Sequence, residues 1–221
     1  MKKILFILCL MPAMLCSAQI DKDQLALAIN KADEANTEQL KAFIWKRKSE
    51  VYIDSALKLT TITEFSFNEA GELETKVVDT ESTVKQKGGI RGKIQQNAAE
   101  DKVDYVGQAL ELSLAYTYMT KGQLIDFLGR ANVTEKDGII EATAENVYVK
   151  GDKLTVRVEA ATNLYLSKKF SSLLGKDPVN GEINFEKFSS GVNHGSTTVL
   201  NLPAQKMRID AKNQDYSQRV K

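Results

Sequence analysis

The chain has 221 residues, of which 43% are hydrophobic and 27% charged, and its 30 basic and 29 acidic residues give a formal net charge of +1. A chain of this length and composition can bury the core of one globular domain. The near balance of charge excludes the basic field that nucleic-acid-binding proteins present, so we predict no nucleic-acid partner.

Residues 1–18 have the layout of a secretory signal peptide. Lys2 and Lys3 precede a short apolar run that a proline interrupts, and small residues end the segment at Ala18. The run is too short to span a bilayer as an anchor. We therefore predict cleavage after Ala18 and no transmembrane span in the chain that remains.

Both cysteines, Cys9 and Cys16, lie within this predicted signal peptide. The mature chain, residues 19–221, would then have no disulfide, no thiolate nucleophile and no cysteine ligand for a metal. Lipidation at Cys16 is the alternative form of processing, and it is disfavoured because Leu15 stands where a small residue is required. The expected location is outside the cytoplasm, in the periplasm.

The first predicted elements are a helix and three strands. Apolar residues recur at helical spacing across residues 21–35, after aspartates that can cap a helix. From Phe43 to Val77 the apolar period changes to two, with a turn at residues 68–71. This pattern predicts three antiparallel strands.

Residues 81–93 form a basic, glycine-rich segment ahead of a predicted helical insertion at residues 94–131. Glycines and a lysine before a helix suggest a phosphate-binding loop. However, Gly88 and Gly92 are one residue too close together for that motif, and an isoleucine follows Lys93 where a hydroxyl is needed. The segment therefore does not predict nucleotide binding.

Two interpretations of the segment stay open. It is either a mobile, solvated joint between strand and helix or a contact for anionic lipid headgroups. The cations that would make the lipid contact are Lys85, Lys87, Arg91 and Lys93.

The last part of the chain reads as a series of strands. Thr120 opens a capping box for the second helix of the insertion. Six strands are then expected between Ile139 and Asp210, the first running from Ile139 to Lys150. Asn180 and Gly181 form the pair preferred in a type I′ hairpin turn. The connections are too short for crossovers, so the strands are expected to be antiparallel neighbours.

These elements predict an α+β fold with a single domain at residues 19–221. About nine antiparallel strands form a strongly curved sheet or open half-barrel. The N-terminal helix and the helical insertion lie on its concave face, because alternating strands need one covered face and one solvated face.

Catalytic and metal-binding patterns are weak. His194 is the single histidine, and its candidate partners would be Ser196 or Asp210, but a lone histidine near a turn is more often structural. No G-x-S-x-G motif occurs. Metal binding requires more ligands in one cluster than the sequence offers. We predict no enzymatic activity, no catalytic residue, no metal and no cofactor.

Apolar side chains on compatible strand faces are either ordinary core or the lining of a cavity for a hydrophobic guest. Sequence alone leaves both interpretations open. The candidate lining residues are Phe43, Trp45, Val51, Phe65, Phe67, Val147, Val156 and Val158.

The order of elements behind the signal peptide resembles the periplasmic lipoprotein-carrier superfamily. That resemblance implies an unclosed half-barrel whose helices plug the concave face and whose interior holds acyl chains. The segments at residues 89–97, 177–179 and 202–206 also resemble uncharacterised exported bacterial proteins, without a role that can be transferred.

Two functions are therefore expected as alternatives. The first is an exported, non-enzymatic protein of the bacterial envelope that holds a lipid, an acyl chain or another hydrophobic ligand. The second is an envelope scaffold with a fully packed core, which binds a protein partner through an edge strand or the basic segment.

Overall fold

The computed structural model describes residues 20–68, 70–82, 90–188 and 190–219, and between residues 90 and 100 it describes the backbone only. The helices are α1 (Lys22–Leu40), α2 (Ile90–Thr117), α3 (Lys121–Arg130) and the 3-10 helix η1 (Pro203–Gln205). The strands are β1 (Phe43–Ile53), β2 (Ala56–Phe67), β3 (Leu73–Ser82), β4 (Asn132–Lys136), β5 (Ile139–Glu145), β6 (Lys153–Glu159), β7 (Tyr165–Leu174), β8 (Asp177–Lys187), β9 (Asn193–Leu202) and β10 (Met207–Gln218).

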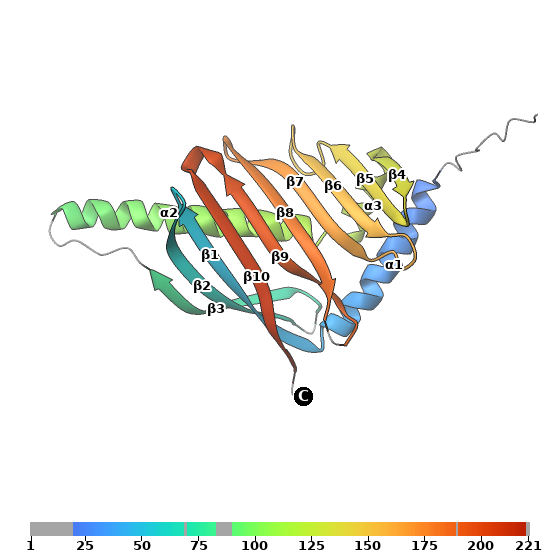
Figure 1. The fold of residues 1–221 in the computed structure, drawn as a ribbon, viewed down its shortest axis with the longest axis horizontal. Helices are drawn as coiled ribbons and strands as arrows, with labels where there is room; N and C mark the ends of the chain where they lie inside the picture. The colour runs from blue at the N-terminus through green and yellow to red at the C-terminus, as the bar shows by residue number, and fades with distance from the viewer. Residues whose placement is uncertain (1–19, 69, 83–89, 189, 220–221) are drawn as a thin grey trace, which may run out of the picture.

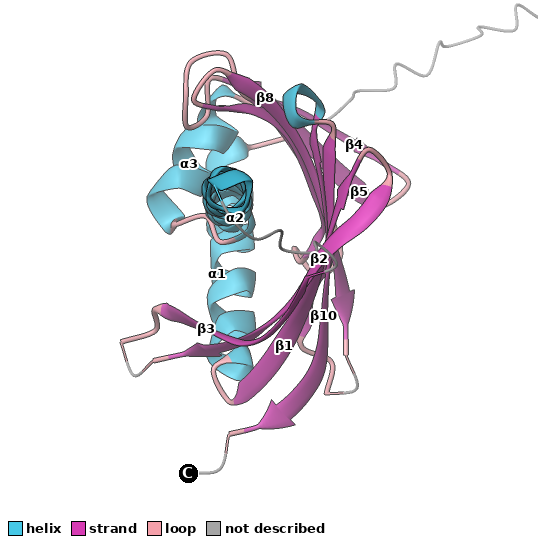
Figure 2. Cartoon of the chain, turned by 90° about the vertical axis from the view of Figure 1, so that its left-hand side faces the viewer, coloured by secondary structure: helices cyan, strands magenta, loops and turns pink. Residues whose placement is uncertain are grey.

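The ten described strands form one antiparallel sheet in the order β3-β2-β1-β10-β9-β8-β7-β6-β5-β4 (Figure 1). The sheet is strongly curved and does not close, so β3 and β4 are its edges. The three α-helices lie on its concave side (Figure 2). The predicted α+β half-barrel is therefore confirmed, with one strand more than expected, because the short strand β4 directly after α3 was missed.

The C-terminal strand β10 joins the two parts of the sheet. It pairs with β1 on one side, for example Ile209 with Val51, and with β9 on the other, for example Asp210 with Val199. The strands before and after the helical insertion therefore belong to a single sheet, as predicted.

Helix ends follow their capping residues. The Asp21 carboxylate accepts hydrogen bonds from the backbone N–H groups of Asp23 and Gln24, at 3.0 and 3.1 Å, and begins α1. The helix continues to Leu40, five residues beyond its predicted end. The predicted capping box at Thr120 is present at the start of α3.

Helix α2 begins at Ile90, four residues before the helical insertion was expected to start. Arg91 and Lys93 are therefore part of its first turns, where the structure describes no side chains. Lys85 and Lys87 lie outside the described residues, as does the predicted signal peptide. The proposed lipid contact of these four cations stays a prediction.

The hairpin turn predicted at Asn180 and Gly181 is wrong. Both residues lie within β8, and the turn between β7 and β8 is at residues 175–176, where Gly175 has φ = 63°. Gly181 is needed for packing: a Cβ atom there would lie 2.2 Å from the ring of Phe170 on the neighbouring strand. The glycine thus makes room for an aromatic ring instead of bending the chain.

The strand predicted from Ile139 to Lys150 ends at Glu145. The buried carboxylate of Asp152 accepts hydrogen bonds from the backbone N–H groups of Val147, Tyr148 and Val149. These groups would otherwise be free to pair with a neighbouring strand. A side chain therefore folds the segment into a tight loop.

The core has two clusters on the concave side. The larger one packs α1, α2 and α3 against strands β4–β10 and includes Ile29, Phe127 and Leu154, exposed by 1% or less. The smaller one is aromatic and is centred on Trp45, with Phe65 and Phe67 of β2. Both clusters cover the apolar face of the sheet, as the alternating strand pattern predicted.

The close approach of Phe170 to Gly181 makes a testable prediction. Replacing Gly181 with alanine should lower the free energy of unfolding by about 1–3 kcal/mol, because the ring must move out of a filled core. Urea denaturation measures this. In a Phe170→Leu background the same substitution should cost less, because the two positions are coupled.

Gly195→Ala in β9 is the matched control, since a Cβ there would meet Ile183 at 3.5 Å, an ordinary contact. Equal costs at Gly181 and Gly195 would contradict the packing explanation.

Candidate functional site

The eight predicted lining residues divide between the two core clusters. Val51, Val156 and Val158 are exposed by 2% or less and belong to the larger cluster, against which the half-buried Val147 packs. The other four belong to the aromatic cluster at the β1–β2 end of the sheet: Phe43, Trp45, Phe65 and Phe67. The structure thus places all eight in the interior and does not bring them into one group. Their role as a ligand lining stays a prediction.

The aromatic cluster is a stack of rings across the seam between β1 and β10. Trp45 is fully buried, and its ring lies parallel to those of Phe65 and Tyr216, each with centroids 5.8 Å away. The ring of Phe67 lies at the same distance, tilted by 49°. The Nε1 atom of Trp45 has no hydrogen-bond partner among the described residues.

Arg47 lies beside this cluster and was not among the predicted site residues. It is only 3% exposed, its Nε atom donates to Oδ1 of Asn213 at 2.8 Å, and its guanidinium stands 4.6 Å from the ring centroid of Phe65. Burial lowers the pKa of Arg47, an effect that Tyr118 and Tyr216 partly offset. No described carboxylate lies within 4 Å of its charge.

A signal for Arg47 existed in the sequence. Residues 45, 47 and 49 share the strand face that carries Trp45, whereas Lys46 and Lys48 share the other. An arginine on the apolar face of a strand must be buried or sit at an opening. The alternation of β1 therefore contained this information, and the apolar residues drew attention away from it.

Lys168 of β7 is a second buried cation, with no exposed surface. Its Nζ atom donates to the backbone carbonyl of Thr117, at the end of α2, at 2.7 Å and lies 3.8 Å from the ring centroid of Tyr165. Burial lowers the pKa of Lys168 to about 8, although the nearby Asp33 opposes that shift. Burial likewise raises the pKa of Asp33, and Lys168 opposes this change.

The position of Lys168 could not be predicted from the strand period. The pairing of β6 with β7 contains a bulge, because Arg157 pairs with Ser167 whereas Val158 pairs with Tyr165. A bulge shifts every later side chain to the opposite face. Tyr165 and Lys168 are consequently both buried, although they are three residues apart.

His194 is buried in β9 and was expected in a loop. Its Nδ1 atom lies 2.6 Å from the hydroxyl of Tyr216. The hydroxyl of Ser196 donates to the backbone carbonyl of Asn184, and Asp210 pairs with Arg208 at 2.7 Å. The three residues of the possible catalytic arrangement thus have separate partners. Among the described residues, no group of three or more histidines, cysteines or carboxylates gathers as for a metal ion.

Polar contacts tie α2 to the sheet side of the chamber. The hydroxyls of Tyr105 and Tyr116 donate to Asp177 and Asp152, at 3.1 and 2.6 Å. The hydroxyl of Tyr148 donates to the backbone carbonyl of Ala115 in α2 at 3.1 Å. Together with the Lys168 contact, these bonds hold the helix by a few directed interactions.

A cavity of about 30 Å³ lies between α1, the end of α2 and strands β7–β9. It has room for one water molecule. Asp33, Tyr118 and His194 are among its lining residues. The interior near Lys168 is therefore polar, in contrast to the apolar core beneath α3.

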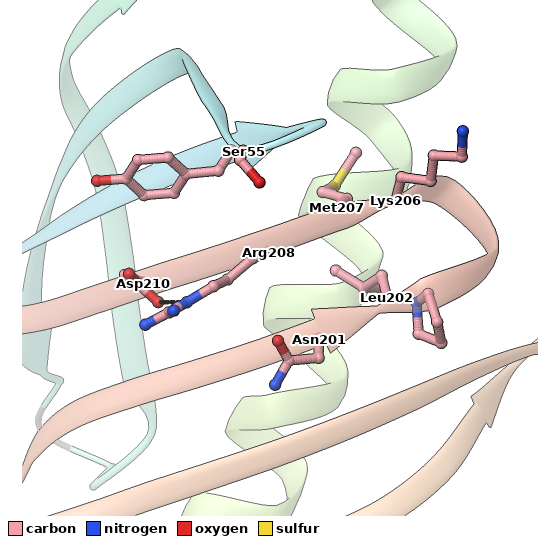
Figure 3. Close-up of a pocket in the computed structure, with 9 residues that line it drawn as sticks. Ser55, Asn201, Leu202, Lys206, Met207, Arg208 and Asp210 are labelled. Carbon is pink, nitrogen blue, oxygen red and sulfur yellow. Dashed lines mark hydrogen bonds and ion pairs between the residues drawn. The ribbon is translucent and has the colours of Figure 1, made fainter.

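A separate hollow of about 600 Å³ lies at the surface, where the β1–β2 hairpin meets the turn between β9 and β10 (Figure 3). The charges around it are paired: Arg208 with Asp210 at 2.7 Å, and Lys206 with Asp54 at 3.9 Å. It offers no unpaired charge to a ligand, so the concave chamber is the better candidate site.

No family model and no curated protein matches the chain. Three solved structures are similar to it. They are a DUF1329 family protein from Desulfovibrio piger (TM-score 0.43, 9% identity, 91% of this chain and 95% of that chain), a LolA superfamily protein from Nitrosomonas europaea (0.42, 11%, 89% and 94%) and an outer membrane lipoprotein-sorting protein domain from Vibrio parahaemolyticus (0.43, 8%, 90% and 94%). The names of the last two agree with the resemblance seen in the sequence. Similarity at this level concerns the arrangement of elements only.

The buried Lys168 predicts how stability changes with pH. Its pKa of about 8 in the folded protein lies below the ordinary value of 10.5. Between these values the unfolded chain binds more protons, so the free energy of unfolding rises with pH. Between pH 7 and pH 10 we expect a gain of about 2 kcal/mol from this group.

Urea denaturation at several pH values measures this gain, and Lys168→Met should remove it. Lys169→Met, which changes the exposed neighbour of Lys168, is the control and should keep the slope. An equal slope in the wild type and in Lys168→Met would show that the buried amine is not its source.

Proposed function

We propose that this protein is an exported, non-enzymatic carrier that holds a lipid or another hydrophobic ligand between the concave face of its sheet and its helices. The observation that carries this proposal is the open half-barrel itself. Its apolar concave face is covered by helices and not by a second sheet (Figure 2). Helices can separate from a sheet without breaking any strand pairing, so the interior can open while the sheet stays intact.

The attachment of α2 supports reversible opening. Directed hydrogen bonds from Tyr105, Tyr116, Tyr148 and Lys168 connect the helix to the strands and their loops. Each such bond contributes about 0.5–3 kcal/mol net, because water replaces it when it breaks. A ligand that buries apolar surface can offset this loss.

The concave face also continues beyond the packed core, onto β2 and β3. Leu59, Thr61 and Thr63 of β2 are half-buried, and Val77 of β3 is 63% exposed. By the strand register, Thr63 pairs with both Arg47 and Val77, so these residues share the concave face. We infer that a ligand enters from this side, where the sheet is least covered.

The location follows from the predicted signal peptide at residues 1–18, and the periplasm is the proposed compartment. Among the described residues, no helix is long and apolar enough to cross a membrane.

An envelope scaffold is the second candidate. The edge strand β3 favours it, since β3 pairs only with β2 among the described strands and its residues from Glu74 to Ser82 are exposed. An exposed strand edge can receive a strand from a partner protein.

The single tryptophan tests the carrier proposal. Trp45 has no exposed surface, so a brominated fatty acid can quench its fluorescence only by entering the chamber. We expect saturable quenching of the delipidated mature protein. The control moves the reporter to the outer face of β1, in the double variant Trp45→Phe/Tyr52→Trp, and should show no saturable quenching.

A fully packed scaffold predicts a different result. Saturable quenching would be absent with brominated fatty acids and with brominated phospholipids. Val156→Phe would then lower the free energy of unfolding by about 1–3 kcal/mol as an overpacked core residue. A carrier would instead show a larger loss of binding than of stability in this variant.

A further inference from the structure

The terminal nitrogens of Arg47 lack partners inside the protein. A guanidinium has five N–H groups, and the described hydrogen bonds of Arg47 engage only the one on Nε. The side chain is 3% exposed, so water can replace few of the missing bonds. A buried cation without a carboxylate is costly unless other groups compensate for the charge.

The compensation that the protein provides is partial. The ring of Phe65 lies under the guanidinium and contributes a cation–π contact, worth about 0.5–2 kcal/mol. Asn213 accepts from Nε and is itself fixed, because its amide nitrogen donates to the carbonyl of Gly195 at 2.5 Å. These contacts hold the guanidinium in one orientation and leave its Nη1 and Nη2 atoms unpaired.

Trp45 supplies a second, independent observation. Its Nε1–H is a donor with no partner, in a side chain with no exposed surface. Such orphaned buried donors are rare in native proteins and call for an explanation. Trp45 and Arg47 are on the same face of β1, and both contact the ring of Phe65.

Further polar groups surround this pair. The concave face beside Arg47 carries the hydroxyls of Ser49, Thr61 and Thr63, by the register of β1 and β2. Tyr118 of α2 influences the charge of Arg47 and packs edge-on against Phe67. The surroundings combine donors with aromatic walls and contain no described carboxylate within 4 Å of the guanidinium.

We propose that Arg47 and Trp45 form a binding site for an anionic oxygen group, a carboxylate or a phosphate. The guanidinium would donate from Nη1 and Nη2 to two oxygens of the group, and the indole Nε1–H would donate as well. Planar guanidinium groups suit this two-point contact. This inference rests on the proposed carrier function and deepens it: the ligand is a hydrophobic molecule with an acidic head.

The first test compares a long-chain fatty acid with the alcohol of the same chain length at pH 8, by isothermal titration calorimetry. The wild type should bind the acid about 10- to 100-fold more tightly than the alcohol, which is the weight of one charged hydrogen-bonded contact. Arg47→Met should remove this preference while keeping the affinity for the alcohol. Lys48→Met, on the outer face of the same strand, should keep the preference.

The second test uses the single indole N–H of Trp45, which gives one nitrogen–proton resonance in an NMR spectrum. Titration of the wild-type protein with the fatty acid should shift this resonance downfield, and the alcohol should shift it less. This readout requires no substitution, so it decides the question even if Arg47→Met fails to fold.

Inorganic phosphate separates the two sources of the anion. If phosphate alone shifts the indole resonance and Arg47→Lys weakens that effect, the site recognises an anion even where no lipid binds. Saturable binding of acid and alcohol with equal affinity would overturn the anion site and leave the carrier function standing. No binding of either lipid, with no response to phosphate, would overturn both proposals.

Discussion

The pairing of β10 with β1 is the constraint on which the rest of the molecule depends. It joins residues that are far apart in the chain, such as Arg47 and Asn213, separated by 166 positions. Without it, β1–β3 would be a three-stranded sheet with no connection to the remaining strands. Closing so long a loop costs conformational entropy. Burial of the aromatic cluster on both sides of this seam, with Trp45 on β1 and Tyr216 on β10, offsets that cost.

The same seam holds the polar groups that give the chamber its character. Arg47 and Lys168 bring two positive charges under the helices, and neither has a described carboxylate within 4 Å. Lys168 is stabilised by the carbonyl of Thr117, where the helix dipole places negative partial charge. Arg47 relies on Phe65 and Asn213. One cation therefore fastens a helix, and the other is left with donors to spare.

Local sequence signals predicted part of this site. The alternation of β1 and β2 placed Trp45 and Phe65 on the inner face, and the same parity includes Arg47. Lys168 was beyond reach, because a bulge between β6 and β7 reverses the inward and outward positions. Asn180 and Gly181 gave the wrong turn, since the preference of this pair was overridden by the space that the Phe170 ring requires.

The sequence by itself determined the kinds of element, the capped starts of α1 and α3, the antiparallel half-barrel and the absence of cysteines after residue 18. These depend on short-range periodicity and on residue chemistry, which are complete in the printed chain. Only the tertiary structure decided which buried polar groups meet, because Arg47 finds Asn213, and Lys168 finds Thr117, across long stretches of chain. Their partners depend on strand register and on a bulge, which no local pattern specifies.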